Sequence, residues 1–406
     1  MTEPAASPMR HRPFVYFWAT RIASILGFQI VMVAVGWQLY LLTGKALDLG
    51  LLGLAQFLPV LLVTIPAGAI ADRFDRRRIV ALCQAIEAVT IAALTFGMLS
   101  GALGRNGIIA LAAILGAARA FEHPAMASLL PNLLPRELVP RGTAWSVSAN
   151  QAAQIAGPAL GGALLWLAPW LAGAASLALF ALAVTLVSSI RSPRIERRSE
   201  PVTVVSLLSG FRFVVQHRLL LGTLSLDLFV VLLGGATALL PIYARDILHV
   251  GPAGLGMLRA APAVGALAMS IWLARNPLGD GVGRKLFAAV ITFGLATIAF
   301  GLSTAMPAAL LALAVLGAAD VISVVIRFSL VQLNTPDEMR GRVSAVNSLF
   351  IGASNQLGEF ESGAVAALTS AVASAVIGGI GSIAVALAWM RLFPELRKIR
   401  SLDPSG

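Results

Sequence analysis

Charged residues stand inside long apolar stretches of this sequence, where only a membrane or a protein interior can surround them. Seven of them have side chains that bind protons, pair with one another or hold a charged solute: Arg21, Arg119, Glu122, Asp227, Asp320, Arg327 and Glu359. A charge near the centre of a membrane helix costs about 2.5 to 3.5 kcal/mol on insertion scales. Each of these residues must therefore be paired, hydrated or functional.

Helical spacing sorts these residues, because side chains three, four or seven positions apart share a helix face. Arg119 and Glu122 share a face by this rule, as do Asp320 and Arg327. Glu359 belongs to a stripe of polar or small residues and is predicted to face a water-filled cavity. Structural ion pairs between helices are the alternative for any single residue. For the group as a whole this alternative is weaker, because Gly, Ala and Ser already suffice to pack membrane helices closely and are abundant here.

The composition identifies an integral membrane protein. The 406 residues are 58% hydrophobic and only 12% charged, with a mean hydropathy of +0.86, whereas soluble domains carry about 25% charge. Basic loops at the cytoplasmic face explain the net charge of +11 better than nucleic-acid binding does. The single cysteine, Cys83, excludes an internal disulfide bond.

Twelve segments are long enough to span a membrane, which needs a helix of about 20 mainly apolar residues. They lie near residues 14–41, 49–71, 79–100, 107–130, 143–166, 169–190, 219–244, 253–274, 286–304, 307–331, 343–368 and 371–391. Tight joins within two helix pairs leave ten or eleven helices as the alternative. The loops on the side opposite the termini hold only Lys45, Arg105 and Arg245. Both termini are therefore predicted to be cytoplasmic, in a multi-pass protein of a bacterial-type plasma (inner) membrane.

A polar stretch divides the chain into two halves. Residues 191–218 are predicted to be a cytoplasmic linker between an N-terminal bundle, 1–190, and a C-terminal bundle, 219–406. Within the linker, residues 204–215 have the pattern of a short amphipathic helix on the membrane surface. At an offset of 201, Leu115-Gly116-Ala117-Ala118 matches Leu316-Gly317-Ala318-Ala319, and Pro135, Glu137 and Arg141 match Pro336, Glu338 and Arg342. The prediction is an all-α membrane fold of two six-helix bundles related as parallel repeats.

One charged segment, Gly68-Ala-Ile-Ala-Asp72-Arg73-Phe74-Asp75-Arg76-Arg77-Arg78-Ile79, separates two apolar segments and is interpreted as a loop at a membrane face. Its spacing, Gly-x-x-x-Asp-Arg-x-x-Arg-Arg, is similar to the loop between helices 2 and 3 of the major facilitator superfamily of transporters. The resemblance implies a conformational switch made by Gly68, Asp72, Arg73, Arg76 and Arg77. A cytoplasmic anchor of arginines is the alternative.

Further stretches refine this resemblance. Gly157-Pro158-Ala-Leu-Gly161-Gly162 is similar to the glycine–proline motif of antiporters in the superfamily, which implies export. A packing kink with no bearing on direction is the alternative. The stretches Arg21-Ile-Ala-Ser-Ile-Leu-Gly and Thr335-Pro336-Asp337-Glu338-Met339-Arg340-Gly341-Arg342 resemble the enterobactin-exporter branch, which includes siderophore exporters. In the superfamily, helices 1, 4, 7 and 10 line the central cavity, and an arginine in the place of Arg119 is tied to proton transfer. The resemblance therefore implies a pathway for substrate and protons, which includes Glu359 and is formed by Arg21, Arg119, Glu122, Asp227, Asp320 and Arg327.

The resemblance implies a secondary transporter and no enzyme activity. The predicted function is proton-coupled export of a small amphipathic molecule such as a siderophore, by alternating access, with Asp320 or Glu122 as the proton carrier. A flippase or efflux pump for lipid-like or drug-like compounds is the alternative within transport, and a non-transporting receptor or intramembrane enzyme is the alternative from another class. We expect a monomer whose partners are the substrate, protons and membrane lipid. No cofactor, metal, nucleotide or nucleic acid is expected, since no phosphate-binding Gly-x-x-x-x-Gly-Lys-Ser/Thr motif occurs.

Overall fold

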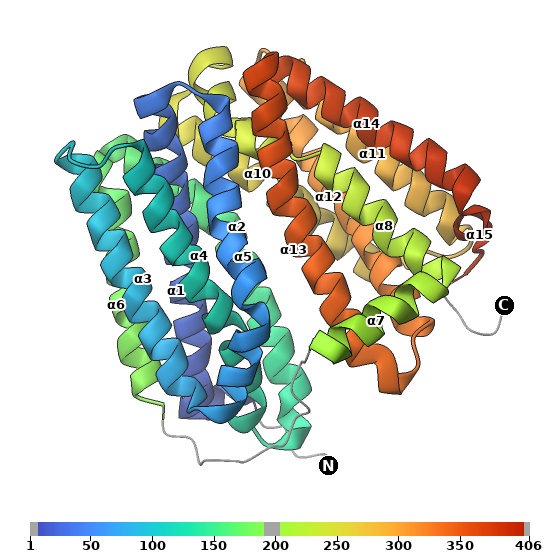
Figure 1. Ribbon diagram of the computed structural model, residues 1–406, viewed down its shortest axis with the longest axis horizontal. Coiled ribbons are helices and arrows are strands. Elements are labelled where there is room, and N and C mark those ends of the chain that lie inside the picture. Colours follow the sequence, from blue (N-terminus) through green and yellow to red (C-terminus); the bar gives the residue numbers. More distant parts are fainter. Residues whose placement is uncertain (1–6, 191–203, 402–406) are drawn as a thin grey trace. The chain divides into compact units, whose positions relative to one another are not determined.

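A computed structural model of the chain describes residues 7–190 and 204–401, and for residues 64–73 and 204–207 it describes the backbone alone. Every regular element in these ranges is a helix (Figure 1). The first six long helices are α1 (Arg12–Thr43), α2 (Ala46–Arg73), α3 (Arg76–Leu99), α4 (Arg105–Leu129), α5 (Val139–Leu167) and α6 (Pro169–Ser188). The later ones are α8 (Arg218–Leu233), α10 (Gly251–Arg275), α11 (Val282–Gly301), α12 (Met306–Leu333), α13 (Asp337–Leu368) and α14 (Ala371–Leu392).

The predicted twelve-helix arrangement is confirmed, and most helix ends fall within a few residues of the predicted ones, with the end of α8 as the main exception. In the described part of the chain, ten helices are long and apolar enough to cross a membrane. The other two, α5 and α13, are 29 and 32 residues long but carry more polar side chains. Their polar faces explain why composition alone identifies them less clearly.

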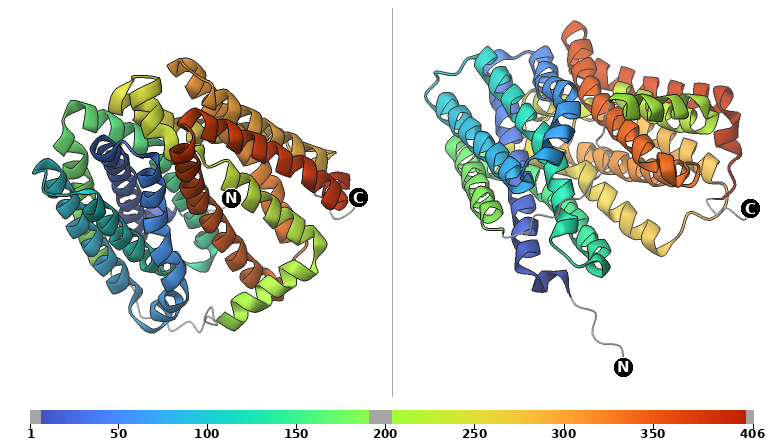
Figure 2. Two further views of the ribbon diagram at one scale, coloured as in Figure 1. Left: turned by 45° about the horizontal axis from the view of Figure 1, so that its top comes forward. Right: turned by 60° about the horizontal axis from the view of Figure 1, so that its bottom comes forward.

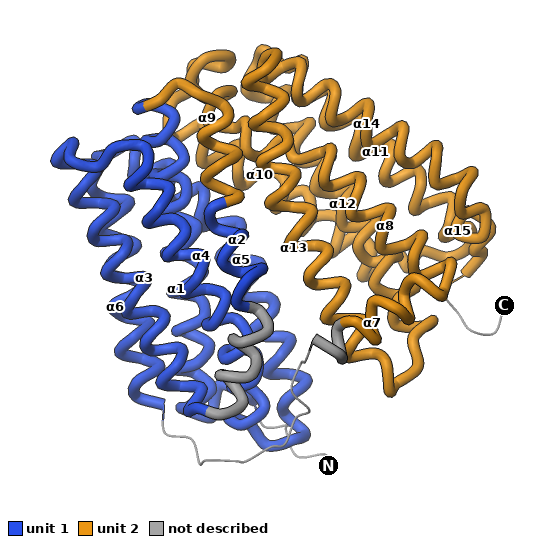
Figure 3. Tube along the Cα trace, viewed as in Figure 1, with its two compact units in different colours: residues 1–42, 55–202 blue, residues 43–54, 203–406 orange. Residues whose placement is uncertain are grey.

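The chain divides into two compact units (Figure 3). Unit 1 comprises residues 1–42 and 55–202, and unit 2 comprises residues 43–54 and 203–406. The first turns of α2 therefore belong to unit 2, where Gly50 lies against the backbone of Phe360 on α13. The predicted bundle boundaries, in contrast, followed the chain order without interruption.

The internal repeat recurs in the packing of each unit. In unit 1, α3 packs against α4 and α6, and in unit 2 the corresponding α11 packs against α12 and α14 (Figures 1 and 2). The matched glycines each lie against a backbone carbonyl of another helix in the same unit. Gly116 contacts the carbonyl of Gln56 on α2, and Gly317 contacts that of Pro262 on α10. Any side chain at these two positions would collide with the carbonyl oxygen. The repeated sequence therefore preserves sites of close helix approach.

The predicted spanning segment 219–244 is confirmed as Arg218–Ile247, but it is not one regular helix, because α8 ends at Leu233 and the chain continues through irregular turns. A 3₁₀ turn (η4, Ala236–Leu239), a single α turn (α9, Leu240–Ile242) and a π turn (η5, Tyr243–Ile247) follow. Gly234 and Gly235 favour the break, since glycine is a poor helix former. Pro241 adds to it, since proline has no N–H to donate. Breaks of this kind at membrane depth occur where a membrane protein lines a cavity or a site.

Short helices complete unit 2. The predicted amphipathic helix 204–215 is present as α7 (Val204–Gln216), which packs against α13 and α8. Its buried Val214 joins a small core with Leu220 and Val343. The last helix, α15 (Pro394–Lys398), packs against α11.

Candidate functional site

Unit 1 contains a polar cavity of about 280 Å³ between α1, α4 and α5, here called the unit 1 cavity. Its polar lining consists of Arg21, Ser24, Gln29, Arg119, Glu122, His123, Asn150 and Gln154. Spacings of three and four residues bring the α4 side chains onto one face, and the same spacing joins Gln154 to Asn150 at 3.1 Å. The three residues predicted for this half, Arg21, Arg119 and Glu122, all line the cavity.

Arg119 contacts an aromatic ring and a histidine, and one of its terminal nitrogens is buried without a partner among the described residues. Its guanidinium lies 3.9 Å from the centre of the Phe28 ring, as in a cation–π contact. One terminal nitrogen, Nη2, is 3.3 Å from Nε2 of His123. The other, Nη1, is buried and has no hydrogen-bond partner among the described residues. The cavity therefore presents a positive group with an unused donor, which suits an anionic solute.

Glu122 does not make a direct ion pair with Arg119 among the contacts of the described residues. Its Oε1 instead accepts a hydrogen bond of 2.8 Å from Nε2 of Gln84 on α3. Both side chains are buried. Gln84, which does not itself line the unit 1 cavity, therefore orients the carboxylate of Glu122.

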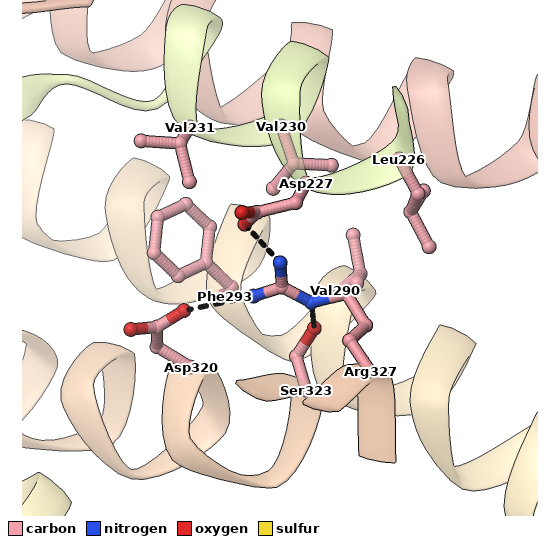
Figure 4. A pocket seen from close by; sticks show the side chains of 9 residues that line it. All are labelled: Leu226, Asp227, Val230, Val231, Val290, Phe293, Asp320, Ser323 and Arg327. Carbon is pink, nitrogen blue, oxygen red and sulfur yellow. Dashed lines mark hydrogen bonds and ion pairs between the residues drawn. The ribbon is translucent and has the colours of Figure 1, made fainter. Parts of the chain in front are cut away.

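Unit 2 contains a cluster of Asp227 on α8 and Asp320, Ser323 and Arg327 on α12, here called the arginine cluster (Figure 4). Nη1 of Arg327 lies 2.5 Å from Oδ1 of Asp227. Its Nε donates to Oγ of Ser323 at 3.0 Å, and Nη2 is 4.0 Å from Oδ1 of Asp320. The free space here is only about 10 Å³, room for about one water molecule.

The arginine cluster combines unequal acids. The side chains of Asp227 and Arg327 are 8% and 6% exposed, whereas that of Asp320 is 44% exposed. One arginine with two ionised carboxylates has a net charge of −1, and a single proton neutralises it. Asp227 is engaged by the short contact to Arg327, so Asp320 is the acid that remains available for that proton.

Glu359 lines neither of these two sites. It accepts a side-chain hydrogen bond from Thr237, in the broken segment after α8, and interacts electrostatically with Arg259 of α10. The neighbouring Gly358 lies against the backbone carbonyl of Val231 on α8. Glu359 thus joins α13 to the break in the seventh helix, and the predicted water-filled cavity around it stays a prediction.

The predicted loop of residues 68–79 is shorter than expected, because α2 continues to Arg73 and α3 begins at Arg76. Gly68, Asp72 and Arg73 therefore lie on α2, and their side chains fall outside the described residues. Arg76 and Arg77 open α3. The helices extend into this segment because no proline or glycine interrupts it between residues 69 and 79.

Arg77 joins the start of α3 to the end of α6. Asp75 caps α3, accepting from the Arg77 backbone N–H at 3.0 Å, and its Oδ2 lies 2.8 Å from Nη2 of Arg77. Nη1 of Arg77 donates to the carbonyl of Ile190 at 2.6 Å. The hydrogen bond from Arg77 lowers the pKa of Asp75. In unit 2 a different contact holds the start of α11, where the N–H of Gly283 donates to the carbonyl of Ile399 at 3.0 Å.

The glycine–proline segment of α5 packs against α1. Its residues Gly157, Pro158, Gly161 and Gly162 are all buried, and the helix continues through the proline. A Cβ on Gly161 would lie 2.9 Å from the backbone oxygen of Ile30, and Gly157 meets the side chain of Gln29, which lines the unit 1 cavity. The segment therefore fixes the distance between two walls of that cavity.

No group of three or more His, Cys, Asp or Glu side chains within residues 7–190 and 204–401 is arranged to hold a metal ion.

Solved structures of membrane transporters share this fold. A bacterial homolog of the human lysosomal transporter Spinster, in an inward-facing and occupied conformation, matches with a TM-score of 0.75 and 15% identity over 99% of this chain and 100% of that chain. The nucleoside transporter NupG matches with a TM-score of 0.73 and 13% identity, over 94% of this chain and 99% of that chain. A bacterial homologue of the iron transporter ferroportin, in an inward-facing state, matches with a TM-score of 0.68 and 18% identity. The match covers 95% of this chain and 99% of that chain. These identities show the fold alone, and it is that of the major facilitator superfamily.

The helices that can cross a membrane, together with the family model and the relatives, show a multi-pass membrane transporter rather than an enzyme. Relatives match along nearly the whole chain. The enterobactin exporter EntS of Citrobacter koseri is 27% identical over 403 residues, covering 97% of this chain and 95% of that protein. The same exporter of Salmonella typhimurium is 26% identical over 405 residues, with the same coverage. The profile of the transmembrane secretion effector family matches residues 3–405, and the chain belongs to that family.

Sequence reasoning missed several residues of these sites. Gln84 and Ser323 are uncharged, and only their spacing of three or four residues from an acid or an arginine on the same helix could have indicated them. Arg259 lies within the predicted membrane segment 253–274, but its place beside Glu359 could not be predicted, because the two lie 100 positions apart in the sequence. Thr237 lies in a helix break that the apolar pattern conceals.

Proposed function

We propose that this transporter exports an anionic, iron-chelating small molecule of the siderophore class in exchange for protons. The observation that carries the proposal is the guanidinium of Arg119, which has an unused donor in an open polar cavity. Arg21, in the same cavity, adds a second positive charge. The exporters that match along 97% of this chain are named for enterobactin.

The proton step is assigned to Asp320, with Glu122 as the alternative carrier. Asp320 is half-exposed beside Arg327, so it exchanges a proton with water while Asp227 stays bound to the arginine. Glu122 lies beside the substrate cavity and Arg21 acts on it electrostatically. In either case binding of a proton removes a negative charge, which weakens its attraction to a neighbouring arginine.

Alternating access of two halves, 1–190 and 219–406, moves the substrate. In this proposal Gly68, Asp72, Arg73, Arg76 and Arg77 switch between the states, and the packed glycine–proline segment of α5 supports antiport. The broken seventh helix beside Glu359 supplies a flexible element of the second half. The protein works as a monomer in the bacterial inner membrane, with both termini in the cytoplasm and residues 191–218 as the linker between halves.

Equilibrium binding of an iron-free siderophore to the purified, full-length protein tests the proposal. A charge-assisted hydrogen bond contributes about 1.5 to 3 kcal/mol, so Arg119→Gln should weaken binding by about 10- to 100-fold. Arg136→Gln removes the same charge from an exposed position in unit 1 and should leave the affinity unchanged. Equal affinities of the two variants, or no binding by the wild-type protein, would refute the assignment.

Export of lipid-like compounds is the second candidate, and a separate cavity supports it. An apolar cavity of about 470 Å³ lies between α10, α11 and α12, with Trp272 and Lys285 among its lining residues. A fluorescent lipid-like dye that binds the wild-type protein, and that Arg119→Gln leaves bound, would favour this candidate over the siderophore.

A further inference from the structure

Glu87 is a buried acid that the proposed pathway does not use. It lies at the middle of α3 with none of its surface exposed. Neither of its carboxyl oxygens has a hydrogen-bond partner among the described residues. Most buried polar groups in proteins are hydrogen-bonded, so two unpartnered oxygens on one side chain require an explanation.

Few charged or titratable groups surround Glu87. Glu122 and Arg119 of α4 act on it electrostatically, and Cys83 lies one turn away on its own helix. The other helix packed against α3 is α6, which contains no charged or titratable residue between 169 and 188. The cavity residues His123 and Arg21 lie beyond this layer and act on Arg119 and Glu122 rather than on Glu87. Glu87 therefore faces one acid and one arginine.

An ionised carboxylate cannot be stable in this place without a partner. Burying an unpaired charge costs several kcal/mol even after the surroundings relax. A proton on Glu87 removes the charge and also provides an O–H donor. An unsatisfied acceptor, Oε1 of Gln84, lies one helical turn away on the same face and also has no partner among the described residues. One proton thus removes the buried charge and provides a donor for Oε1 of Gln84.

Gln84 connects this position to the cavity. Its Nε2 donates to Oε1 of Glu122 at 2.8 Å, and Glu122 lines the unit 1 cavity. The order from water inward is therefore the cavity, Glu122, Gln84 and Glu87. Two acids so placed beside one arginine hold a single proton more readily than none or two. Two carboxylates would repel each other, and two neutral acids would leave the positive charge of the arginine uncompensated.

We propose that Glu87 is a proton-binding site behind the cavity wall, loaded and unloaded through Glu122. The inference rests on the proposed proton coupling and gives it a location in unit 1. In this proposal the resting state has the proton on Glu87 rather than on Glu122. Unloading transfers the proton from the Glu87 carboxyl to the Glu122 carboxylate and then to water, so no proton or charge is lost. Gln84 is a positioning residue, since its amide orients both acids and keeps its own protons.

Infrared spectroscopy of the full-length protein in lipid vesicles tests this without any substrate. A protonated carboxyl group has a carbonyl stretching band that a carboxylate lacks. The wild-type protein should show such a band at neutral pH, Glu87→Gln should lose it, and Glu87→Asp should shift it. Glu137→Gln makes the same chemical change at an exposed position of unit 1 and should leave the band intact. A spectrum of Glu87→Gln identical to that of Glu137→Gln would overturn the site.

The route through Glu122 has its own measurement. Transfer into D₂O shifts the band as the carboxyl proton exchanges, and the rate of this shift reports access. Glu122→Gln should slow the exchange at least about tenfold, since the neutral amide cannot accept the proton. An unchanged rate would overturn the route. If vesicles move no siderophore while Glu87→Gln still loses its band, the proposed function fails and the proton site stands.

Discussion

Replacing Asp227 with Asn removes the main partner of a buried arginine. In the arginine cluster the side chains of Asp227 and Arg327 are 8% and 6% exposed and their closest atoms are 2.5 Å apart. Removal of one member of a buried pair destabilises a protein by about 3 to 5 kcal/mol, because the other charge stays buried without compensation. Asp320, 4.0 Å away and 44% exposed, keeps part of the attraction. We therefore expect the lower end of the range, about 3 kcal/mol.

The free energy of unfolding of the purified protein in detergent micelles, followed by tryptophan fluorescence, measures this loss. Asp246→Asn is a matched control, since its ion pair with Arg245 is 3.5 Å long with both side chains at least 40% exposed. Surface pairs contribute about 0 to 1 kcal/mol, so the control should change little.

A double replacement separates burial from pairing. Asp227→Leu combined with Arg327→Met removes both charges from the apolar site and should recover most of the stability lost by Asp227→Asn. If Asp227→Asn is as stable as Asp246→Asn, or if the double variant is less stable than Asp227→Asn alone, the reasoning about the arginine cluster is wrong.

Two further predictions concern the packing of unit 1. Asp75→Ala should lower the free energy of unfolding by about 1 kcal/mol, the usual contribution of a helix cap. Because the hydrogen bond from Arg77 lowers the pKa of Asp75 in the folded protein, this stabilisation is present above the unfolded pKa of about 4 and is lost as the pH falls through the folded-state value. The difference between wild type and variant should therefore vanish in acid, and a difference that persists there would contradict the capping assignment. Gly116→Ala should destabilise by about 1 to 3 kcal/mol, because its methyl group meets the Gln56 carbonyl. Gly341→Ala, on α13 with open space around it, should be neutral or stabilising in the same unfolding measurement, and equal losses in the two glycine variants would contradict the close helix approach.

The helices could be predicted from the sequence because apolar length and charged boundaries determine where a membrane helix begins and ends. The offset of 201 also indicated the repeated packing, since Gly116 and Gly317 occupy equivalent close approaches. The break after Leu233 was missed, because Gly234, Gly235 and Pro241 stand within a segment that is apolar throughout. Apolar periodicity reports burial, but it does not report the path of the backbone.

Pairing of side chains was less predictable than their placement. Charged residues at membrane depth were recognised from type alone, and Asp320 and Arg327 were grouped because they share a helix. The closest partner of Arg327 is Asp227, however, which lies on another helix and has no spacing relation to it. The neutral residues that complete the sites, such as Gln84 and Thr237, become visible only once the helices are packed.

Gradient-driven uptake of an iron-free siderophore into inverted membrane vesicles tests the central claim most directly. Wild-type vesicles acidified inside should accumulate the siderophore, and accumulation should collapse when the pH gradient is dissipated. Asp320→Asn should retain exchange of siderophore across the membrane but lose accumulation driven by the gradient, at equal protein abundance. Accumulation that is the same with and without the gradient in wild-type vesicles, or that is unchanged in both Asp320→Asn and Glu122→Gln, would contradict proton-coupled export through these acids.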